Sequence, residues 1–179
     1  MSDRQATVLL VTGPAGSGKT TTALEWASTS TRRAAHLSVD DMSLVVKTGR
    51  VSGAEQGDEA LLQWHLAVAA TGAAAEGYAA AGIDCAIDAY LLPEQLDLWS
   101  WTAPFDPLIV VLLPDVETAV QRNGRRVEST GWGVPEWQVY ANHSAMGAWH
   151  EHTSALVIDN STSTVEEVVA EIRRRCAER

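Results

Sequence analysis

The sequence has few lysines and few positive charges of any kind. Only Lys19 and Lys47 are lysines, and 13 Lys and Arg residues stand against 23 Asp and Glu residues, so the formal net charge at pH 7 is −10. A surface this acidic argues against general binding to nucleic acid or to acidic lipid, because both carry negative charge. It leaves room for a local basic site that binds a small anion.

The sequence also has few cysteines and lacks long apolar runs. Cys85 and Cys176 are the two cysteines; their spacing is not that of a metal site, and Cys85 falls in an expected buried strand. No run reaches the roughly eighteen apolar residues that span a bilayer, and residues 1–6 lack the apolar core of a signal peptide. We therefore expect a cytoplasmic protein, and the 179 residues predict a single domain over 1–179.

A glycine-rich motif is the most specific feature that the sequence does contain. The apolar run 8–12 is followed by G-x-x-x-x-G-K-T at residues 13–20 and then by a segment compatible with a helix. Glycines let the backbone turn tightly, so that N–H groups of the loop and of the helix start converge on phosphate oxygens. Lys19 is expected to place its charge on the β- and γ-phosphates, and the Thr20 hydroxyl to coordinate Mg²⁺. The expected nucleotide-binding residues are Gly13, Pro14, Ala15, Gly16, Ser17, Gly18, Lys19, Thr20, Thr21 and Arg122.

Apolar runs alternate with helical segments along the whole chain. Parallel strands are joined by helical crossovers and covered on both faces, so this alternation predicts a three-layer α/β fold with a five-stranded parallel sheet. The expected strands are 7–12, 34–39, 83–88, 107–113 and 155–158. The expected helices are 18–28, 58–82, a short one within 89–101, one that leads from 114 into an arginine-rich tract, 135–152 and 164–176.

Two adjacent carboxylates, Asp40 and Asp41, follow the second expected strand. Open parallel sheets build their sites at the carboxyl ends of their strands. A carboxylate beside an acceptor hydroxyl orients this nucleophile and takes its proton, so we expect Asp40 to be a catalytic base. Asp41 points elsewhere in this interpretation and caps the next turn, although the sequence leaves open which of the two is the base. The alternative is that both are strand-end caps.

A third carboxylate, Asp88, ends the third expected strand. An aspartate at this place beside a phosphate loop commonly holds Mg²⁺, directly or through water, so Asp88 and Thr20 are the candidate metal ligands. Contact with the acceptor and a structural cap are the alternatives for Asp88.

Residues 42–57 are the least regular stretch, with Gly49, Gly53 and Gly57 dividing it. Connections this long are commonly functional or mobile. Because the stretch follows the carboxylate pair, we expect residues 42–60 to help to bind the acceptor. A surface loop without a function is the alternative.

Three arginines, Arg122, Arg125 and Arg126, lie after the fourth expected strand, on a helix that runs toward a polar tract at 128–133. In so acidic a protein they favour a role toward an anion, in which Arg122 and Arg126, spaced i,i+4, stabilise charge that develops during transfer. Residues 122–134 are thus expected to act as a lid. The alternative is a solvated positive patch.

Histidines and tryptophans give weaker signals. His150 and His152 are two residues apart and do not share a helix face, so we reject a metal site there, and His36, His65 and His143 are interpreted as lone histidines without a function. Aromatic residues near expected strand ends suggest an acceptor pocket, with core packing as the alternative for each of them. These residues are Trp99, Trp101 and Trp132.

Five segments together resemble the small P-loop kinases of the nucleoside and gluconate kinase superfamily. They are GPAGSGKTT, LSVDD, CAIDAY, AVQRNGRR and LVIDNS, and within the superfamily the chain is similar to chloramphenicol phosphotransferase and related antibiotic phosphotransferases. The resemblance implies the strand order 2-3-1-4-5, ATP with Mg²⁺ as the donor, Asp40 as the base and a lid that carries arginines. It also implies that the adenine lies near residues 160–164.

The function expected from these features is ATP-dependent transfer of the γ-phosphate to a hydroxyl of a small molecule, such as an antibiotic or another secondary metabolite. Alternatives are a kinase for a nucleoside, a sugar acid or a cofactor precursor, a regulatory nucleotide switch, and a nucleotide-binding module without catalysis. The N-K-x-D motif of guanine recognition is missing, which argues against a GTPase switch. The acceptor, the preference for ATP over GTP and the choice between monomer and homo-oligomer stay open.

Overall fold

The five predicted strands form one parallel sheet in the computed structural model, which describes residues 5–51, 57–131, 133–152 and 154–179. The strands are β1 (Val8–Thr12), β2 (Ala34–Ser38), β3 (Asp84–Asp88), β4 (Leu108–Leu112) and β5 (Ala155–Ile158). Their order is β2-β3-β1-β4-β5, as the resemblance implies, and every neighbouring pair is parallel. The fold class is therefore confirmed.

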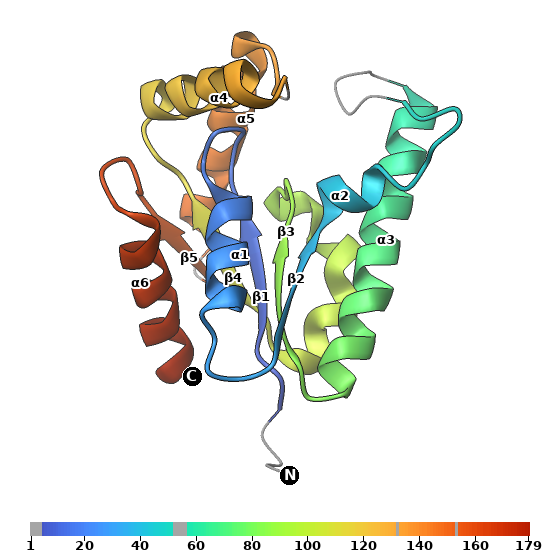
Figure 1. Ribbon diagram of the computed structural model, residues 1–179, viewed down its shortest axis with the longest axis vertical. Coiled ribbons are helices and arrows are strands. Elements are labelled where there is room, and N and C mark those ends of the chain that lie inside the picture. The colour runs from blue at the N-terminus through green and yellow to red at the C-terminus, as the bar shows by residue number, and fades with distance from the viewer. Residues whose placement is uncertain (1–4, 52–56, 132, 153) are drawn as a thin grey trace.

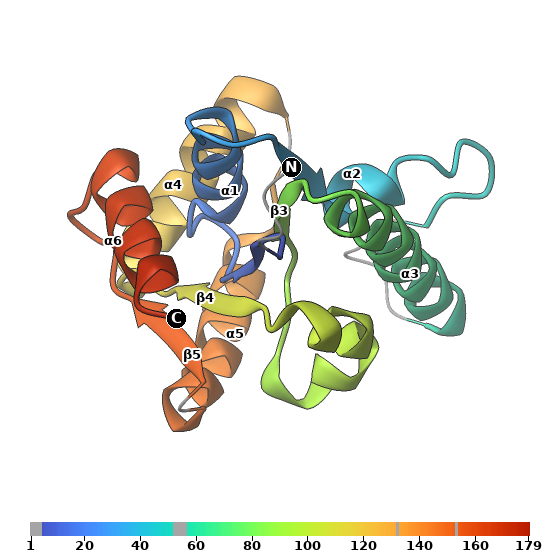
Figure 2. The same cartoon turned by 90° about the horizontal axis from the view of Figure 1, so that it is seen from below.

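Helices cover both faces of this sheet (Figure 1). They are α1 (Lys19–Ser28), α2 (Val39–Ser43), α3 (Asp58–Ala80), α4 (Val116–Thr130), α5 (Glu136–Met146) and α6 (Val165–Ala177), with 3₁₀ helices η1 (Pro93–Phe105) and η2 (Gly147–Glu151). Figure 2 shows α1 and α6 on one side of β4 and α5 on the other. No helix that the structure describes is long and apolar enough to cross a membrane.

The alternation of side chains along β1 divides the core into two layers. Val8 and Leu10 join a cluster with side chains of α3 and η1, whereas Leu9 and Val11 join a cluster with side chains of α1 and α6. Successive side chains of a strand point to opposite faces, so a strand that is apolar throughout supplies both layers at once. Trp99 is 1% exposed within the first layer. Its proposed place in an acceptor pocket is therefore wrong, and core packing holds. Trp132 and the side chain of Trp101 lie outside the part of the chain that is described.

The second strand ends one residue earlier than predicted, and a short helix follows it at once. The Ser38 side chain accepts a hydrogen bond from the backbone N–H of Asp41 and caps α2. Asp40 and Asp41 therefore lie in the first turn of a helix, where negative charge is favourable, and not in an extended strand end. The predicted cap role of Asp41 is wrong, because Ser38 is the cap.

Other helix boundaries also differ from the prediction. Helix α3 begins at Asp58, as predicted, but ends at Ala80, two residues before the predicted end. Residues 128–130 still belong to α4, which ends at Gly131 with φ 72°. All three arginines of the tract consequently lie within a continuous helix. The predicted helix 135–152 divides at Gly147 into α5 and η2.

Candidate active site

The phosphate loop is held tightly against the elements around it, and two positions require glycine. Gly13 has φ +155°, and a Cβ there would lie 2.4 Å from the Leu112 carbonyl oxygen. Gly16 has φ +81°, and a Cβ there would lie 2.1 Å from the Ala119 carbonyl oxygen. These distances are far below contact distance, so the loop reaches its conformation only without side chains at these positions.

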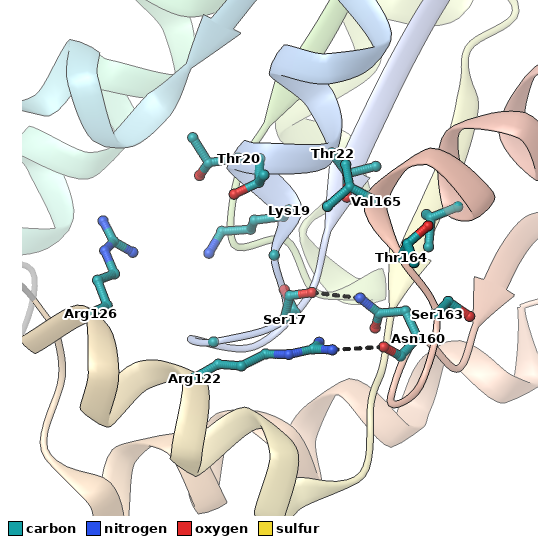
Figure 3. A pocket seen from close by; sticks show the side chains of 14 residues that line it. Ser17, Lys19, Thr20, Thr22, Arg122, Arg126, Asn160, Ser163, Thr164 and Val165 are labelled. Atoms are coloured by element: carbon teal, nitrogen blue, oxygen red, sulfur yellow. Dashed lines mark hydrogen bonds between the residues drawn. The ribbon is translucent and has the colours of Figure 1, made fainter.

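The loop forms one wall of a pocket of about 500 Å³ (Figure 3). Its lining joins the start of α1, the arginines of α4 and the segment between β5 and α6. The lining residues are Gly16, Ser17, Gly18, Lys19, Thr20, Thr21, Thr22, Arg122, Arg126, Asn160, Ser163, Thr164, Val165 and Val168. Figure 3 shows the Lys19 side chain extending from the start of α1 in the direction of Arg126. The pocket thus combines loop amides, a helix N-terminus and cationic side chains, which together suit a polyphosphate.

The two candidate metal ligands lie within hydrogen-bond distance of each other. Thr20 Oγ1 donates to Asp88 Oδ2 at 2.8 Å, and Asp88 has no exposed surface. Ser38 Oγ donates to the same Oδ2 at 3.3 Å, and His36 Nε2 lies 2.6 Å from Asp88 Oδ1. A hydroxyl and a carboxylate are hard oxygen donors of the kind that Mg²⁺ prefers, and such sites use few protein ligands beside phosphate and water. The residues present therefore fit Mg²⁺.

Sequence reasoning gave His36 no function, and it placed Asn160 only within the segment expected near the adenine. Asn160 Nδ2 donates to the Ser17 carbonyl at 2.8 Å, and Arg122 Nη2 donates to the carbonyls of Asn160 and Ser161 at 3.0 and 3.2 Å. Asn160 thereby connects the segment after β5 with the phosphate loop and with α4 (Figure 3). The segment LVIDNS indicated this region, but not which side chain reaches the loop.

With this geometry established, comparison with known proteins assigns the chain to a family. The model of the AAA domain family matches residues 8–152. The chain belongs to the AAA domain family. No curated protein sequence matches it.

Solved structures share the whole fold of this AAA domain at low sequence identity. Shikimate kinase from Acinetobacter baumannii in complex with shikimate has a TM-score of 0.69 at 16% identity, over 97% of this chain and 94% of that one. A gluconokinase from Sinorhizobium meliloti 1021 gives 0.63 at 16% identity, over 93% and 89% of the two chains. The tunicamycin resistance protein of Deinococcus radiodurans gives 0.64 at 14% identity, over 96% of each chain. The fold is thus that of small P-loop kinases. The AAA domain family implies nucleotide binding.

The remaining predicted residues of the AAA domain lie at different distances from the pocket. Arg122 and Arg126 line the pocket, whereas Arg125 is not among the described residues that line it. Asp40 and Asp41 are exposed on α2 and also lie outside that set. Asp40 nevertheless follows Ser38 by two residues, and Ser38 bonds to Asp88. The sheet therefore brings Asp40 to the edge where Thr20 and Asp88 meet.

The pKa values of Asp115, at the N-terminus of α4, and of Cys85, in β3, are shifted from their ordinary values. Backbone and side-chain hydrogen bonds from Thr118 lower the pKa of Asp115, with a smaller contribution from Ser161. Burial raises the pKa of Cys85 to about 11, so this thiol stays protonated as a small core residue, as the sequence predicts. The described residues contain no cluster of three or more His, Cys, Asp or Glu side chains that could hold a metal ion.

Proposed function

We propose that this protein is an ATP- and Mg²⁺-dependent kinase that transfers the γ-phosphoryl group to a hydroxyl of a small molecule. The observation that carries the proposal is the hydrogen bond from Thr20 to the buried Asp88, directly beside the phosphate loop and Lys19. A buried carboxylate aimed at the loop threonine is costly for a protein unless it is paired or serves a cation. The match to the AAA domain family and the shared fold of small-molecule kinases support the same interpretation.

The loop and the helix that follows it bind the phosphates in this proposal. Backbone N–H groups of the phosphate loop and of the N-terminus of α1 donate to the phosphate oxygens, and the Lys19 ammonium holds the β- and γ-phosphates. Arg126 and the free donors of the Arg122 guanidinium face the same pocket, where they stabilise charge that develops during transfer. Arg122 also fixes the segment after β5 through its two backbone contacts.

Thr20 and Asp88 would hold Mg²⁺ in the same site. The ion would supply positive charge that offsets the negative charge of the phosphates. Asp88 contributes directly or through water, and its hydrogen bond with the Thr20 hydroxyl keeps both oxygens at one place.

Asp40 is the proposed base. It accepts the proton of the acceptor hydroxyl, so that the oxygen attacks the γ-phosphorus in line with the leaving ADP oxygen. Asp41 is the alternative base, because both carboxylates are exposed on the short helix α2. Residues 42–60 are the proposed acceptor segment, of which 52–56 lie outside the described residues.

Charge favours an acceptor without a carboxylate. No Lys or Arg occurs between Arg50 and Arg122, and the 23 residues of α3 begin with Asp58 and Glu59. Recognition of a carboxylate such as shikimate commonly uses Arg or Lys. Within residues 42–60 these are Lys47 and Arg50, and the Lys47 ammonium already donates to the Leu44 carbonyl. Exposed apolar side chains are present instead. They are Val45, Leu61, Leu62 and Leu66. A neutral or cationic, partly apolar alcohol, such as an antibiotic or another secondary metabolite, therefore fits better than a sugar acid.

A transfer screen tests the proposal. Purified protein with Mg²⁺-ATP would be incubated with hydroxylated antibiotics, nucleosides, neutral sugars and sugar acids, and the products would be weighed by mass spectrometry. A gain of about 80 Da, one phosphoryl group, on a neutral or cationic compound is the expected result. The Lys19→Ala variant is the control and should give no product. ATP hydrolysis that no compound stimulates, without any product, would support a nucleotide switch or a non-catalytic module instead.

A further inference from the structure

Three side chains from two other elements converge on the carboxylate of Asp88. Thr20 and Ser38 donate to Oδ2 at 2.8 and 3.3 Å, and His36 Nε2 contacts Oδ1 at 2.6 Å. A carboxylate oxygen accepts, so Nε2 is the protonated ring nitrogen of His36 in this contact. Asp88 is fully buried, and the His36 side chain is 15% exposed. The two carboxylate oxygens therefore have separate partners.

This separation determines which oxygen faces the phosphate loop. The terminal torsion of an aspartate side chain is soft and roughly two-fold, so the backbone of β3 does not by itself fix the plane of the carboxylate. The parallel register pairs Ser38 with Asp88, and His36 lies on the same face of β2 two residues earlier. Its short contact holds Oδ1 on the β2 side, which leaves Oδ2 for Thr20. Ser38 shares Oδ2 at a longer distance and does not hold Oδ1.

We propose that His36 is a positioning residue for the divalent cation site: its Nε2–H holds Asp88 so that Oδ2 stays directed at Thr20. The inference rests on the proposed assignment of Thr20 and Asp88 to Mg²⁺. His36 touches neither nucleotide nor acceptor in this account and acts through Asp88 alone. Loss of such an outer partner typically weakens metal binding by 10–100-fold. The loss is expected in metal affinity and not in metal-free nucleotide binding.

The test measures Mn²⁺ binding to the protein–ATP complex by electron paramagnetic resonance, and ATP binding in EDTA by calorimetry. His36→Leu fills the volume without a donor, whereas His36→Gln places an amide N–H close to the position of Nε2. His36→Leu should weaken Mn²⁺ binding about 10-fold and leave ATP binding in EDTA within about twofold of the original protein. His36→Gln should restore most of the loss. His65→Ala, which removes an exposed histidine of α3, is the matched control and should change neither value.

Equal Mn²⁺ affinity in His36→Leu and His36→Gln would overturn the inference, as would an equal loss of ATP binding in EDTA. Should His36→Leu fail to fold, His36→Asn replaces it, because its shorter amide does not reach Oδ1. Equal Mn²⁺ affinity in His36→Gln and His36→Asn would then overturn the inference. If the unmodified protein binds Mn²⁺ with ATP but phosphorylates no acceptor, the proposed function fails and the role of His36 stands. If Mn²⁺ does not bind the complex of the unmodified protein, the metal assignment and this inference fail together.

Discussion

The two sides of the carboxyl edge of the sheet are built in opposite ways. On the nucleotide side, Lys19 is 8% exposed, Asp88 is fully buried and Asn160 is 5% exposed. On the acceptor side, Asp40 and Asp41 are exposed on a five-residue helix. Val45 and Leu61, on the same side, are 64% and 54% exposed.

This difference in burial indicates which interactions are already formed in the protein before a ligand binds. Several polar groups of the nucleotide side already pair with one another, as in the bonds of Asp88 with Thr20 and of Asn160 with Ser17. Such preorganised groups need little rearrangement when a ligand arrives. Polar and apolar groups of the acceptor side remain in water, so a bound acceptor is needed to cover them. We therefore expect substitutions on the two sides to affect different steps.

The two lysines of the chain give the largest expected contrast. Lys19→Ala removes the cation from the phosphate pocket and should lower turnover by about 10³-fold, the order of loss seen when one charge-stabilising donor is removed. Lys47→Ala is the matched control, because Lys47 donates to the Leu44 carbonyl on the acceptor side. The measurement is the rate of ADP release with a saturating acceptor. Similar losses in both variants would break the distinction between the sides.

The carboxylates of α2 give the next contrast. Asp40→Asn keeps the shape of the side chain and removes the base, so turnover should fall by about 10²-fold or more. Asp41→Asn should have a small effect, and the ratio of the two rate constants decides which residue is the base. A larger loss in Asp41→Asn would reverse the assignment, and full activity of both variants would exclude α2 from the chemistry.

Two glycines with positive φ, one on each side, allow the two sides to be compared by the free energy of unfolding. Gly16→Ala places a Cβ 2.1 Å from the Ala119 carbonyl oxygen in a left-handed conformation, and we expect a cost of about 3 kcal/mol in the free energy of unfolding. Gly49→Ala, with φ +71°, meets no described atom within 4 Å and should cost about 1 kcal/mol. Urea unfolding measures both values. Equal costs would mean that the loop is less tightly packed than its geometry indicates.

The smallest expected effect is a pH dependence at the start of α4. Hydrogen bonds from Thr118 hold the pKa of Asp115 below its ordinary value. A lowered folded-state pKa contributes stability above the unfolded pKa, and this contribution is lost as pH falls through the folded pKa. Asp115→Asn still caps α4 but does not titrate, so its stability should fall less steeply in acid. Thermal unfolding between pH 5 and about 2.5 measures how steeply the stability of each protein falls with pH, and Asp97→Asn is the control. Parallel curves for Asp115→Asn and the unmodified protein would contradict this account.

The sequence predicts one side of the site much better than the other. The phosphate loop is a local pattern whose glycines are required by backbone conformation, so residues 13–20 can be placed from the sequence alone. Asp88 is also found in this way, because it ends a strand directly after the apolar residues Cys85, Ala86 and Ile87. The contact of His36 with Asp88 joins residues 52 positions apart through strand pairing, and no local pattern indicates it. His36 and Ser38 do share one face of a strand, which is the available signal.

The acceptor side is harder to predict because weak local preferences compete there. Ser38 ends β2 by capping α2, and this bond places Asp40 and Asp41 in a helix that follows the strand at once. Trp99 resembles a binding residue in the sequence, yet it packs in the core, because burial of a large aromatic ring stabilises a domain more than exposure near a site does. The function of exposed apolar residues such as Leu61 depends on which acceptor binds, and the sequence does not identify the acceptor.

The most direct test of the division between the two sides is calorimetric titration of Mg²⁺-ATP into three proteins. The account predicts that the unmodified protein and Asp40→Asn bind the nucleotide with nearly equal affinity, whereas Lys19→Ala binds it at least about 10-fold more weakly. Affinity lost equally in Asp40→Asn and Lys19→Ala, or retained in both, would contradict the claim that the buried side binds the nucleotide and the exposed side activates the acceptor.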